Sequence, residues 1–342
     1  MYDGSALNTK FGSLPIFSKS GIISDGPQIC VIFIFTNSMI NKYFFKYTFL
    51  IFHILQIKYD IYMKADPGYF GPESMMWKVN KEITVLFGGA RALLMHAAHP
   101  LIAAGARQTS FYQRDPWKRL IRTLSLQNSV TFGTKEEADE SANRINKLHE
   151  VINGTDEITG GYYDALDHEQ LLWVHACLQV SSIYFYEKTV KKLSETEKNQ
   201  YHLENTLAAE MVLVDVSLIP KTHESLKDWV IKKSQQEEYL VMTDVAKDVY
   251  DIIGGGPVPT HIKPIWPFIA FTAFNTLPKE FKDIYGIKET KFKSALVAFN
   301  LAILKYTRPF LPPFFRLIAP ARWAKQRLTK KPNLKFKDKS RI

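Results

Sequence analysis

Residues 115–123 read D-P-W-K-R-L-I-R-T, and residues 134–154 read T-K-E-E-A-D-E-S-A-N-R-I-N-K-L-H-E-V-I-N-G. The first part opens with Asp-Pro, a strong helix start, because the carboxylate caps free N–H groups and proline fits the first turn. The second opens with a Thr and has a Glu three residues later, the pattern of a capping box. The sequence therefore predicts two consecutive helices, the first over 115–128 and the second with Gly154 as its C-terminal cap.

These two helices carry chemically active side chains. Arg119 and Thr123 are four residues apart on the first helix, so they share a face. The apolar stripe of the second helix consists of Ala138, Ala142, Ile145, Leu148 or His149, and Ile152. An Arg, a hydroxyl and an isolated His on packed helices supply what a buried haem needs: a partner for a propionate or for oxygen, a hydrogen-bonding group and an axial ligand. The alternatives are a core His satisfied by a backbone carbonyl and an Arg on a solvated surface, which are the common states of these residues.

The rest of the body also reads as helical, because from Glu73 onward apolar residues recur at helical spacing and strand-like alternation is scarce. A helix is expected over 75–98. It contains Gly88 and Gly89, which destabilise a helix interior and so suggest the close approach of another helix or of a flat ligand. Pro100 is expected to end or kink this helix. Further helices are expected at about 167–188, 195–214, 224–236, 239–253, 266–277 and 291–306. The predicted fold class is all-α.

The cysteine content indicates a reducing compartment and, for any haem, non-covalent binding. The chain has 342 residues, 46% of them hydrophobic, enough for a sizeable core in one large domain or two small ones. Its two cysteines, Cys30 and Cys177, give no disulfide framework. Neither CxxC nor CxxCH occurs, which argues against a zinc ribbon, an iron–sulfur site and a covalent c-type haem. We therefore predict a cytoplasmic protein.

The net charge of +10 belongs mainly to the C-terminal end. Residues 322–341 hold nine Lys or Arg against one acid, Asp338. We interpret this end as a solvated basic tail; an anionic membrane surface is the second interpretation and nucleic acid the third. Because no nucleic-acid-binding motif accompanies the charge, we predict no nucleic-acid partner and keep peripheral membrane contact as an alternative.

Residues 1–62 differ in composition from the rest of the chain. They contain no Glu, Arg or Trp, and about half of them are Phe, Tyr, Ile, Lys or Asn. Their two apolar stretches are shorter than the roughly 20 residues that a spanning helix requires. We interpret the segment as upstream sequence, with Met63 as the start of the protein. A weak membrane anchor and a partly ordered extension are the alternatives.

Other candidate ligands have weaker support. His96 and His99 are three residues apart, but a zinc site would require a third ligand and HExxH is absent. We interpret both as pocket wall, with His99 as an alternative haem ligand. His175 and Cys177 are interpreted as packing residues. The chain has no pair of Glu-x-x-His motifs, no GxGxxG, no P-loop and no GxSxG, which argues against a di-iron oxygenase, a nicotinamide enzyme, a kinase and an α/β hydrolase.

A set of blocks in order along the chain resembles the MpaB-type oxygenase family, whose domain is shared with the latex clearing protein, a rubber oxygenase. The blocks are G-P-E-S-M-M-W-K-V-N-K-E, L-F-G-G-A-R-A-L-L-M-H-A-A-H-P-L-I-A-A-G, residues 115–123, L-H-E-V-I-N-G, Y-D-A-L-D-H-E-Q-L-L-W-V-H-A and L-P-K-E-F-K-D-I-Y-G-I. The resemblance covers about residues 68–327. It implies a single globin-like multi-helix domain with a pocket for a non-covalent haem b.

The resemblance also implies a reaction and residue roles. Characterised members cleave a carbon–carbon double bond of an isoprenoid chain with O2, so the expected partners are O2 and a hydrophobic small molecule. His149 matches the axial haem ligand, and Arg119 and Thr123 match residues near the haem. Arg122 stands where rubber-cleaving members carry a Lys. We also expect the haem carboxyl groups to meet Arg119 or Arg91, and apolar side chains such as Trp173 to line the substrate site.

Two other functions remain open from the sequence: a haem-binding carrier or sensor without turnover, and a membrane-peripheral helical protein without a cofactor. The predicted organisation is an N-terminal extension over 1–62, a haem-binding oxygenase domain over 63–327 and a basic tail over 328–342. Oligomeric state and substrate are not encoded in any pattern that we identify.

Overall fold

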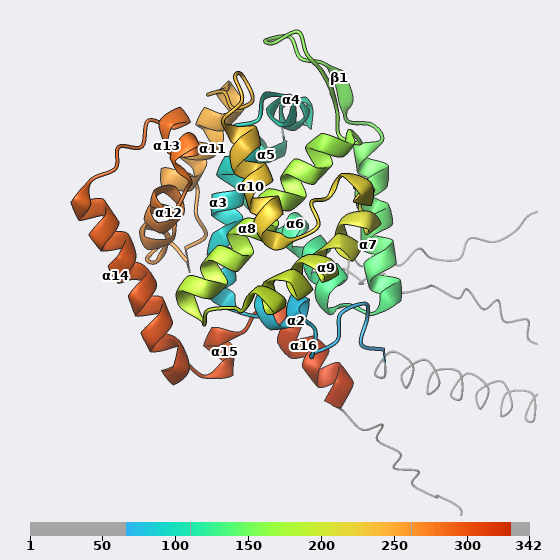
Figure 1. Ribbon diagram of the computed structural model, residues 1–342, viewed down its shortest axis with the longest axis vertical. Coiled ribbons are helices and arrows are strands. Elements are labelled where there is room, and N and C mark those ends of the chain that lie inside the picture. Colours follow the sequence, from blue (N-terminus) through green and yellow to red (C-terminus); the bar gives the residue numbers. More distant parts are fainter. Residues whose placement is uncertain (1–65, 110, 261, 330–342) are drawn as a thin grey trace, which may run out of the picture. The chain divides into compact units, whose positions relative to one another are not determined.

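Two helices, α3 (Phe87–Ala97) and α8 (His168–Thr189), lie against each other at the centre of the fold (Figure 1). This computed structural model describes residues 66–109, 111–260 and 262–329, so the predictions for 1–62 and for the end of the tail lie outside it. Gly88 is the reason that the two helices approach so closely. A β-carbon placed on it would stand 3.0 Å from the Ser181 carbonyl oxygen, so the close approach of another helix predicted at this glycine is confirmed.

The remaining elements surround this pair. In chain order they are α2 (Met75–Asn80), η1 (Ile83–Leu86), α4 (Pro100–Thr109), α5 (Phe111–Arg114), α6 (Pro116–Phe132), α7 (Lys135–His149), β1 (Asn153–Thr155), β2 (Tyr162–Asp164), α9 (Glu195–Met211), η2 (Val216–Leu218), α10 (His223–Ser234), α11 (Asp244–Gly255), α12 (Trp266–Asn275), α13 (Lys279–Ile284), α14 (Lys291–Thr307), η3 (Arg308–Phe310), α15 (Pro313–Arg316) and α16 (Ala319–Thr329). In the part of the chain that the structure describes, β1 and β2 are the only strands, and they form one antiparallel hairpin. The all-α prediction is confirmed, apart from this short hairpin.

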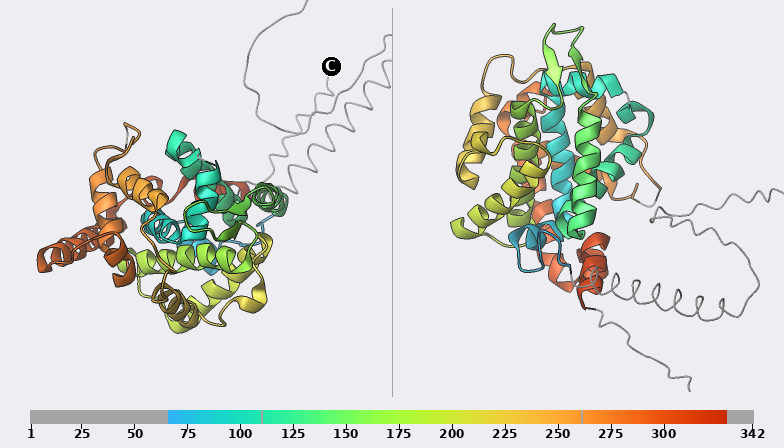
Figure 2. Two further views of the ribbon diagram at one scale, coloured as in Figure 1. Left: turned by 90° about the horizontal axis from the view of Figure 1, so that it is seen from above. Right: turned by 90° about the vertical axis from the view of Figure 1, so that its right-hand side faces the viewer.

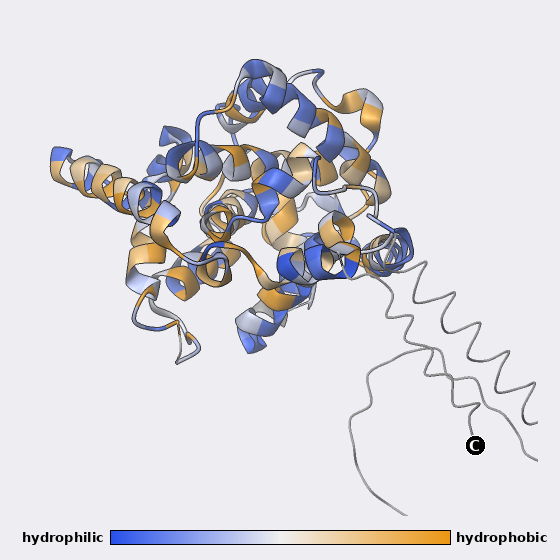
Figure 3. Cartoon of the chain, turned by 90° about the horizontal axis from the view of Figure 1, so that it is seen from below, coloured by the Kyte–Doolittle hydropathy of each residue, from blue (hydrophilic) through white to orange (hydrophobic). Residues whose placement is uncertain are grey.

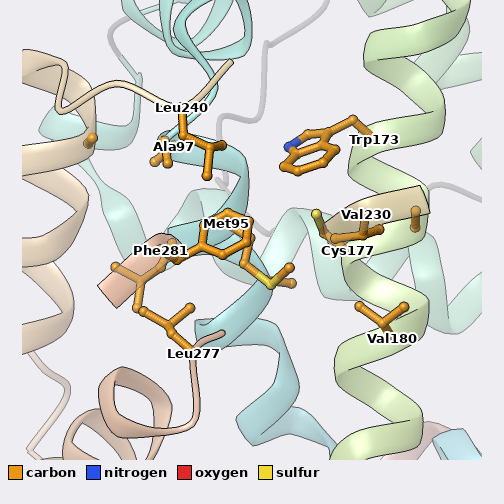
Figure 4. Close-up of a cluster of buried hydrophobic side chains, with 14 of the residues drawn as sticks. Met95, Ala97, Trp173, Cys177, Val180, Val230, Leu240, Leu277 and Phe281 are labelled. Carbon is orange, nitrogen blue, oxygen red and sulfur yellow. The ribbon is translucent and has the colours of Figure 1, made fainter. Parts of the chain in front are cut away.

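The main core lies on one side of the central pair, where α3 and α8 meet the segments from α10 to α13. Figure 4 shows Trp173 and Cys177 of α8 facing Met95 of α3 and Phe281 of α13. The Trp173 and Phe281 rings stack with centroids 6.1 Å apart, and neither side chain is exposed to solvent. Full burial of such a side chain contributes about 1.5–3 kcal/mol.

The other side of the central pair faces α6, α7 and α9. The helices α6 and α7 are separated by only Gly133 and Thr134 and pack against each other, which makes them an antiparallel pair. The helix α7 is the green helix at the front of the right-hand view in Figure 2. The predicted caps of this pair are confirmed: the Asp115 carboxylate accepts from Lys118 N, and Thr134 and Glu137 form the capping box. The prediction for Gly154 is wrong, because α7 ends at His149 and Gly154 belongs to β1, where it packs against the Tyr163 ring.

The single helix expected over 75–98 is broken, and the break is a tertiary effect. Between α2 and η1, the buried Glu82 carboxylate accepts from Arg308 Nε at 2.8 Å and Nη2 at 2.6 Å. Ile318 N also donates to Lys81 O. A segment more than 200 residues away therefore takes the backbone and side-chain bonds that a continuous helix would have used locally.

Pro100 behaves as the sequence predicts. It opens α4, and the axis of α4 is bent by 102° from that of the segment Ile83–Ala97. Among the described residues, no single helix is both long and apolar enough to cross a membrane; only this bent pair passes that test together.

Candidate active site between α3, α6 and α8

A hollow lies on the side of α3 and α8 that faces away from the main core. It is lined by Asn80, Val85, Leu86, Gly89, Leu124, Gln127, Asn128, Thr131, Leu178 and Ser182. Its cavity volume is about 30 Å³, enough for about one water molecule and well below the roughly 300–1,000 Å³ of a small-molecule site. It combines apolar walls with a few polar groups, the kind of lining that such sites have. We call this space the hollow below.

The helices α3 and α8 border the hollow at half-buried positions. On α3 the half-buried positions Gly89, Leu93 and His96 follow helical spacing, and on α8 His175 and Leu178 are half-buried. Of these five residues, Gly89 and Leu178 line the hollow. A β-carbon at Gly89 would meet nothing within 4 Å, in contrast to the tightly covered Gly88, so the helix surface at Gly89 borders open space.

The antiparallel pairing of α6 and α7 brings Arg119 and His149 to the same level. Arg119 is fourteen residues before Gly133, where the helices turn, and His149 is fifteen residues after Thr134. Because both helices rise by 1.5 Å per residue, the two side chains start from nearly equal distances along the pair. The two predicted site residues, Arg119 on α6 and His149 on α7, therefore lie at the same end of this helix pair.

His149 is the inward-facing member of the two residues left open by the sequence. Leu148 is 55% exposed, whereas His149 is half-buried. The Nδ1 atom of His149 is buried and has no hydrogen-bond partner among the described residues. Burial lowers the pKa of His149, so the imidazole is neutral at pH 7. Neutral imidazole is the form that binds a metal.

Arg119 lies near α3 as well as beside α7. Burial lowers the pKa of His96 to about 4, the bond to Val174 O opposes this shift, and the positive charge of Arg119 lowers the pKa further. The Arg119 side chain is half-buried, whereas Arg122 and Thr123 are exposed. The Thr123 hydroxyl donates to Arg119 O at 3.1 Å. The charge of Arg119 therefore reaches the facing helix α3.

The sequence matches the family model described as the ER-bound oxygenase mpaB/B′ and rubber oxygenase catalytic domain, over residues 77–306. The chain belongs to this oxygenase family. The matched segment contains every residue that lines the hollow, together with Arg119 and His149. No curated protein and no solved structure gives a significant match. Membership supports oxygenase activity, whereas the family description names neither a cofactor nor a substrate for this chain.

The other histidines of this oxygenase-family chain have different surroundings. His96 uses Nε2 in a 3.0 Å bond with Val174 O. His99 packs in the core against the Tyr239 ring, with centroids 4.7 Å apart, and burial lowers its pKa to about 4. His175 is half-buried, and its Nε2 atom is buried without a hydrogen-bond partner. The Nδ1 atom of His99 is also buried without a hydrogen-bond partner, but this side chain lies among aromatic core residues.

Arg91 does not have the role expected for it. Its Nε donates to Thr276 O at 3.0 Å and its Nη1 donates to Ser181 Oγ at 2.6 Å. The guanidinium also stacks over the Tyr184 ring, and burial lowers the pKa of Arg91 to about 10. Arg91 thus links α3 to α8 and to the end of α12, and its side chain is held in the protein interior. Of the two arginines expected to meet the haem carboxyl groups, Arg119 is the remaining candidate.

Two further side chains belong to the core. Cys177 is fully buried and burial raises the pKa of its thiol, which confirms packing as its role. Trp173 lies in the same core and does not border the hollow, so it is unsuited to line a substrate site there. The polar lining residues Gln127, Asn128 and Thr131 were missed. Thr131 lies beyond residue 128, where the first helix was expected to end, whereas Gln127 and Asn128 lie inside that helix and were not singled out. Their signal in the sequence is a helical spacing of amide and hydroxyl side chains.

Proposed function

We propose that the chain is a haem b-dependent oxygenase that acts with O2 on a hydrophobic small molecule. The family supports the oxygenase activity. The observation that carries the haem assignment is the buried, partnerless Nδ1 of the neutral His149, at the same level as Arg119. The proposed reaction is oxidative cleavage of a carbon–carbon double bond, with an isoprenoid chain as the substrate class, following the resemblance of the sequence to rubber oxygenases.

The residues present suit a haem better than a bare metal ion. Within residues 66–329, apart from positions 110 and 261, no group of three or more His, Cys, Asp or Glu is arranged to hold a metal. A haem iron needs only one axial protein ligand, because the porphyrin supplies four nitrogens. His149 fits as that ligand. A β-carbon at Gly89 would meet nothing within 4 Å, which is compatible with the approach of a flat ligand, the second of the two reasons that the sequence offered for this glycine pair.

Each residue has a definable task in this proposal. Bound haem supplies the activation of O2. His149 holds the cofactor through one ring nitrogen and remains neutral because burial depresses its pKa. Arg119 stabilises a carboxylate of the cofactor by charge. Leu124 and Leu178 orient an apolar substrate and exclude water, while Gln127 and Asn128 offer amide donors to a polar group in the hollow.

The proposal also includes three features of the architecture. They are a globin-like arrangement of the helices, a haem pocket formed by the hollow, and a haem-binding domain over 63–327 with Thr123 and Arg122 near the cofactor. His99 is a weaker ligand candidate than His149, because its ring is enclosed by Trp173 and Tyr239. The exposed Arg122 is not a ligand in this proposal, since an Arg remains protonated at neutral pH.

The test is the visible spectrum of the full chain with haem, compared among His149→Gly, His175→Gly and His99→Gln. We expect a Soret band that shifts or disappears only in the His149 variant and that returns when imidazole is added to it. Circular dichroism verifies that each variant folds. Loss of the band in the His175 variant alone would move the ligand to α8, and a wild-type chain that takes up no haem would overturn the haem assignment.

Turnover is tested separately from binding. We expect the haem-loaded chain to consume O2 when a prenyl substrate is present and to yield carbonyl products. The proposal of a haem oxygenase fails if a haem-loaded chain with an intact His149 ligand gives no O2 uptake with any prenyl chain. That result would favour a carrier or sensor.

A further inference from the structure

The helix α14 carries apolar side chains on both of its faces. Its inner face packs on α8 and α12 through Val297, Asn300 and Leu301. Its outer face has Phe292, Phe299, Ile303 and Tyr306, spaced by seven, four and three residues, and all four are exposed. A surface helix normally presents polar residues to water, so a helix that is apolar all round requires a second apolar environment.

The exposed aromatic side chains continue beyond α14. They are Phe292, Phe299, Tyr306, Phe310, Phe314, Phe315 and Trp323, each more than half exposed, and they come from α14, η3, α15 and α16. We call this set the aromatic segment. Figure 3 shows α14 projecting from its neighbours, with hydrophobic colouring along most of its length. A concentration of large exposed apolar side chains in one region marks an interaction surface, whereas scattered single ones do not.

The same segment is strongly basic. Residues 291–329 contain eight Lys or Arg and no Asp or Glu. Two of these cations are committed to the fold, because Arg308 pairs with Glu82 and Arg327 with Glu137. Arg322 stacks over the Phe314 ring, with the guanidinium carbon 4.4 Å from its centroid. Aromatic side chains interleaved with cations are the composition of segments that lie at the surface of an anionic bilayer.

A shallow groove runs between α8 and α14 beside these aromatic residues. It has a volume of about 330 Å³ and is lined by apolar residues of α14 together with Tyr184, Lys188, Lys305 and Tyr306. Two lysines at an apolar groove offer charge to a phosphate or carboxylate head group and apolar surface to the chain attached to it. The groove thus adds a second, independent feature that suits a lipid.

We propose that the aromatic segment docks the protein on an anionic lipid bilayer. The phenylalanines enter the boundary between head groups and acyl chains, and Trp323 and the free lysines remain at head-group level. The positive charge of the aromatic segment favours an anionic bilayer over a second copy of the chain as its partner. Two copies joined through this segment would bring cations against cations, with no acid from either segment to compensate them.

The test uses the full chain in flotation with phosphatidylserine-containing vesicles and with neutral phosphatidylcholine vesicles, at low and high salt. We expect flotation with the anionic vesicles, weakened by salt. The triple variant Phe299→Ser, Phe310→Ser, Phe314→Ser should lose binding by about tenfold for each phenylalanine. The matched control is Leu203→Ser with Ile158→Ser, two equally exposed apolar residues outside the segment, which should bind as the wild type does.

A spectroscopic measurement reports the segment directly. Trp323 is 65% exposed, so its fluorescence should shift to shorter wavelength on binding, and the change should vanish in Trp323→Phe. The proposal is overturned if the wild-type chain does not float, or if the triple variant floats as well as the control. It is also overturned if neutralising the lysines of 330–342 alone abolishes binding, or if the triple variant converts a dimer to a monomer without any vesicle binding by the wild type.

Discussion

Gly88 of α3 lies directly against the backbone of Ser181 in α8, whereas its neighbour Gly89 faces open space. The distances from a hypothetical β-carbon separate the two: 3.0 Å to the Ser181 carbonyl oxygen at Gly88, and nothing within 4 Å at Gly89. Adjacent glycines in a helix differ by 100° in direction. One therefore serves the packing of the central pair, and the other borders the hollow.

Alanine substitution should distinguish these two roles. Gly88→Ala is expected to destabilise the fold by about 1–3 kcal/mol, because backbone atoms of α8 cannot yield as a flexible side chain would. Gly89→Ala should be neutral or stabilise by up to about 1 kcal/mol, because alanine is the better helix former. Chemical denaturation of the two variants measures both effects. Equal behaviour of the two would contradict the close approach of α3 and α8 at Gly88.

The ion pair that breaks the first predicted helix should be strongly coupled. Arg308→Ala leaves the buried Glu82 carboxylate without its bidentate partner, and we expect a loss of about 3–5 kcal/mol in the free energy of unfolding. In the double variant Arg308→Ala, Glu82→Gln the loss should be smaller than the sum of the two single losses. A double-mutant cycle measured by urea unfolding checks this, and additive losses would show that the two side chains are not energetically coupled.

The same ion pair shows why part of the fold could not be predicted from the sequence. Apolar spacing, Asp115–Pro116 and the Thr134 capping box identified helices correctly, because these signals act within a few residues. The break at Glu82 depends on Arg308 and Ile318, more than 200 residues away, and no local pattern reveals it. Gly154 was misread for the same reason, since its place opposite Tyr163 is set by strand pairing.

The candidate site, too, could be predicted from the sequence only in part. The sequence indicated Arg119 and His149, and the pairing of α6 with α7 places them at one level. It could not indicate that Arg91 is committed to Thr276 and Ser181, because those partners come from other helices. Nor could it show that His99, which follows α3, packs against core aromatic rings while Gly89 of α3 borders the hollow.

Acid should weaken the fold through buried histidines. Burial, the largest cause, lowers the pKa of His223 to about 4 from the usual 6.5, and the positive charges of Lys198 and His202 add to the shift. The pKa of His223 is lower in the folded chain than in the unfolded chain. The stability that the neutral His223 contributes is therefore complete above pH 6.5 and is lost as the pH falls toward 4. The loss reaches about 3 kcal/mol. Urea unfolding at a series of pH values should therefore show a steep decline in this range.

His223→Gln provides the control for the pH effect. Glutamine keeps a polar group near Gln179, whose Nε2 lies 3.4 Å from His223 Nδ1, but it does not titrate. The unfolding free energy of this variant should decline less between pH 6.5 and 4 than that of the wild type. A decline identical to the wild type would assign the acid sensitivity to other groups, such as the buried His202.

Arg119 and Arg122 give a matched pair of charge variants on one helix. Arg119→Gln should weaken haem affinity by about three- to tenfold, because one charge-assisted bond to a carboxylate would be lost. The exposed Arg122→Gln should leave the affinity unchanged. Haem titration followed at the Soret band measures both. If the two variants lose affinity equally, the effect is one of general charge and Arg119 has no specific role.

Filling the hollow tests where the proposed cofactor or substrate binds. Gly89→Leu projects a side chain into the uncovered space beside α3, so the free chain should fold with nearly unchanged stability, while ligand binding in the hollow should weaken at least about tenfold. Ile121→Leu, an exposed and volume-conserving change on α6, should alter neither property. Haem titration and O2 uptake with a prenyl chain show whether the cofactor or the substrate occupies the hollow. Weaker haem binding would place the cofactor beside Gly89. Intact haem binding with impaired uptake would place the substrate there, and a variant identical to the wild type in both would show that the hollow holds neither.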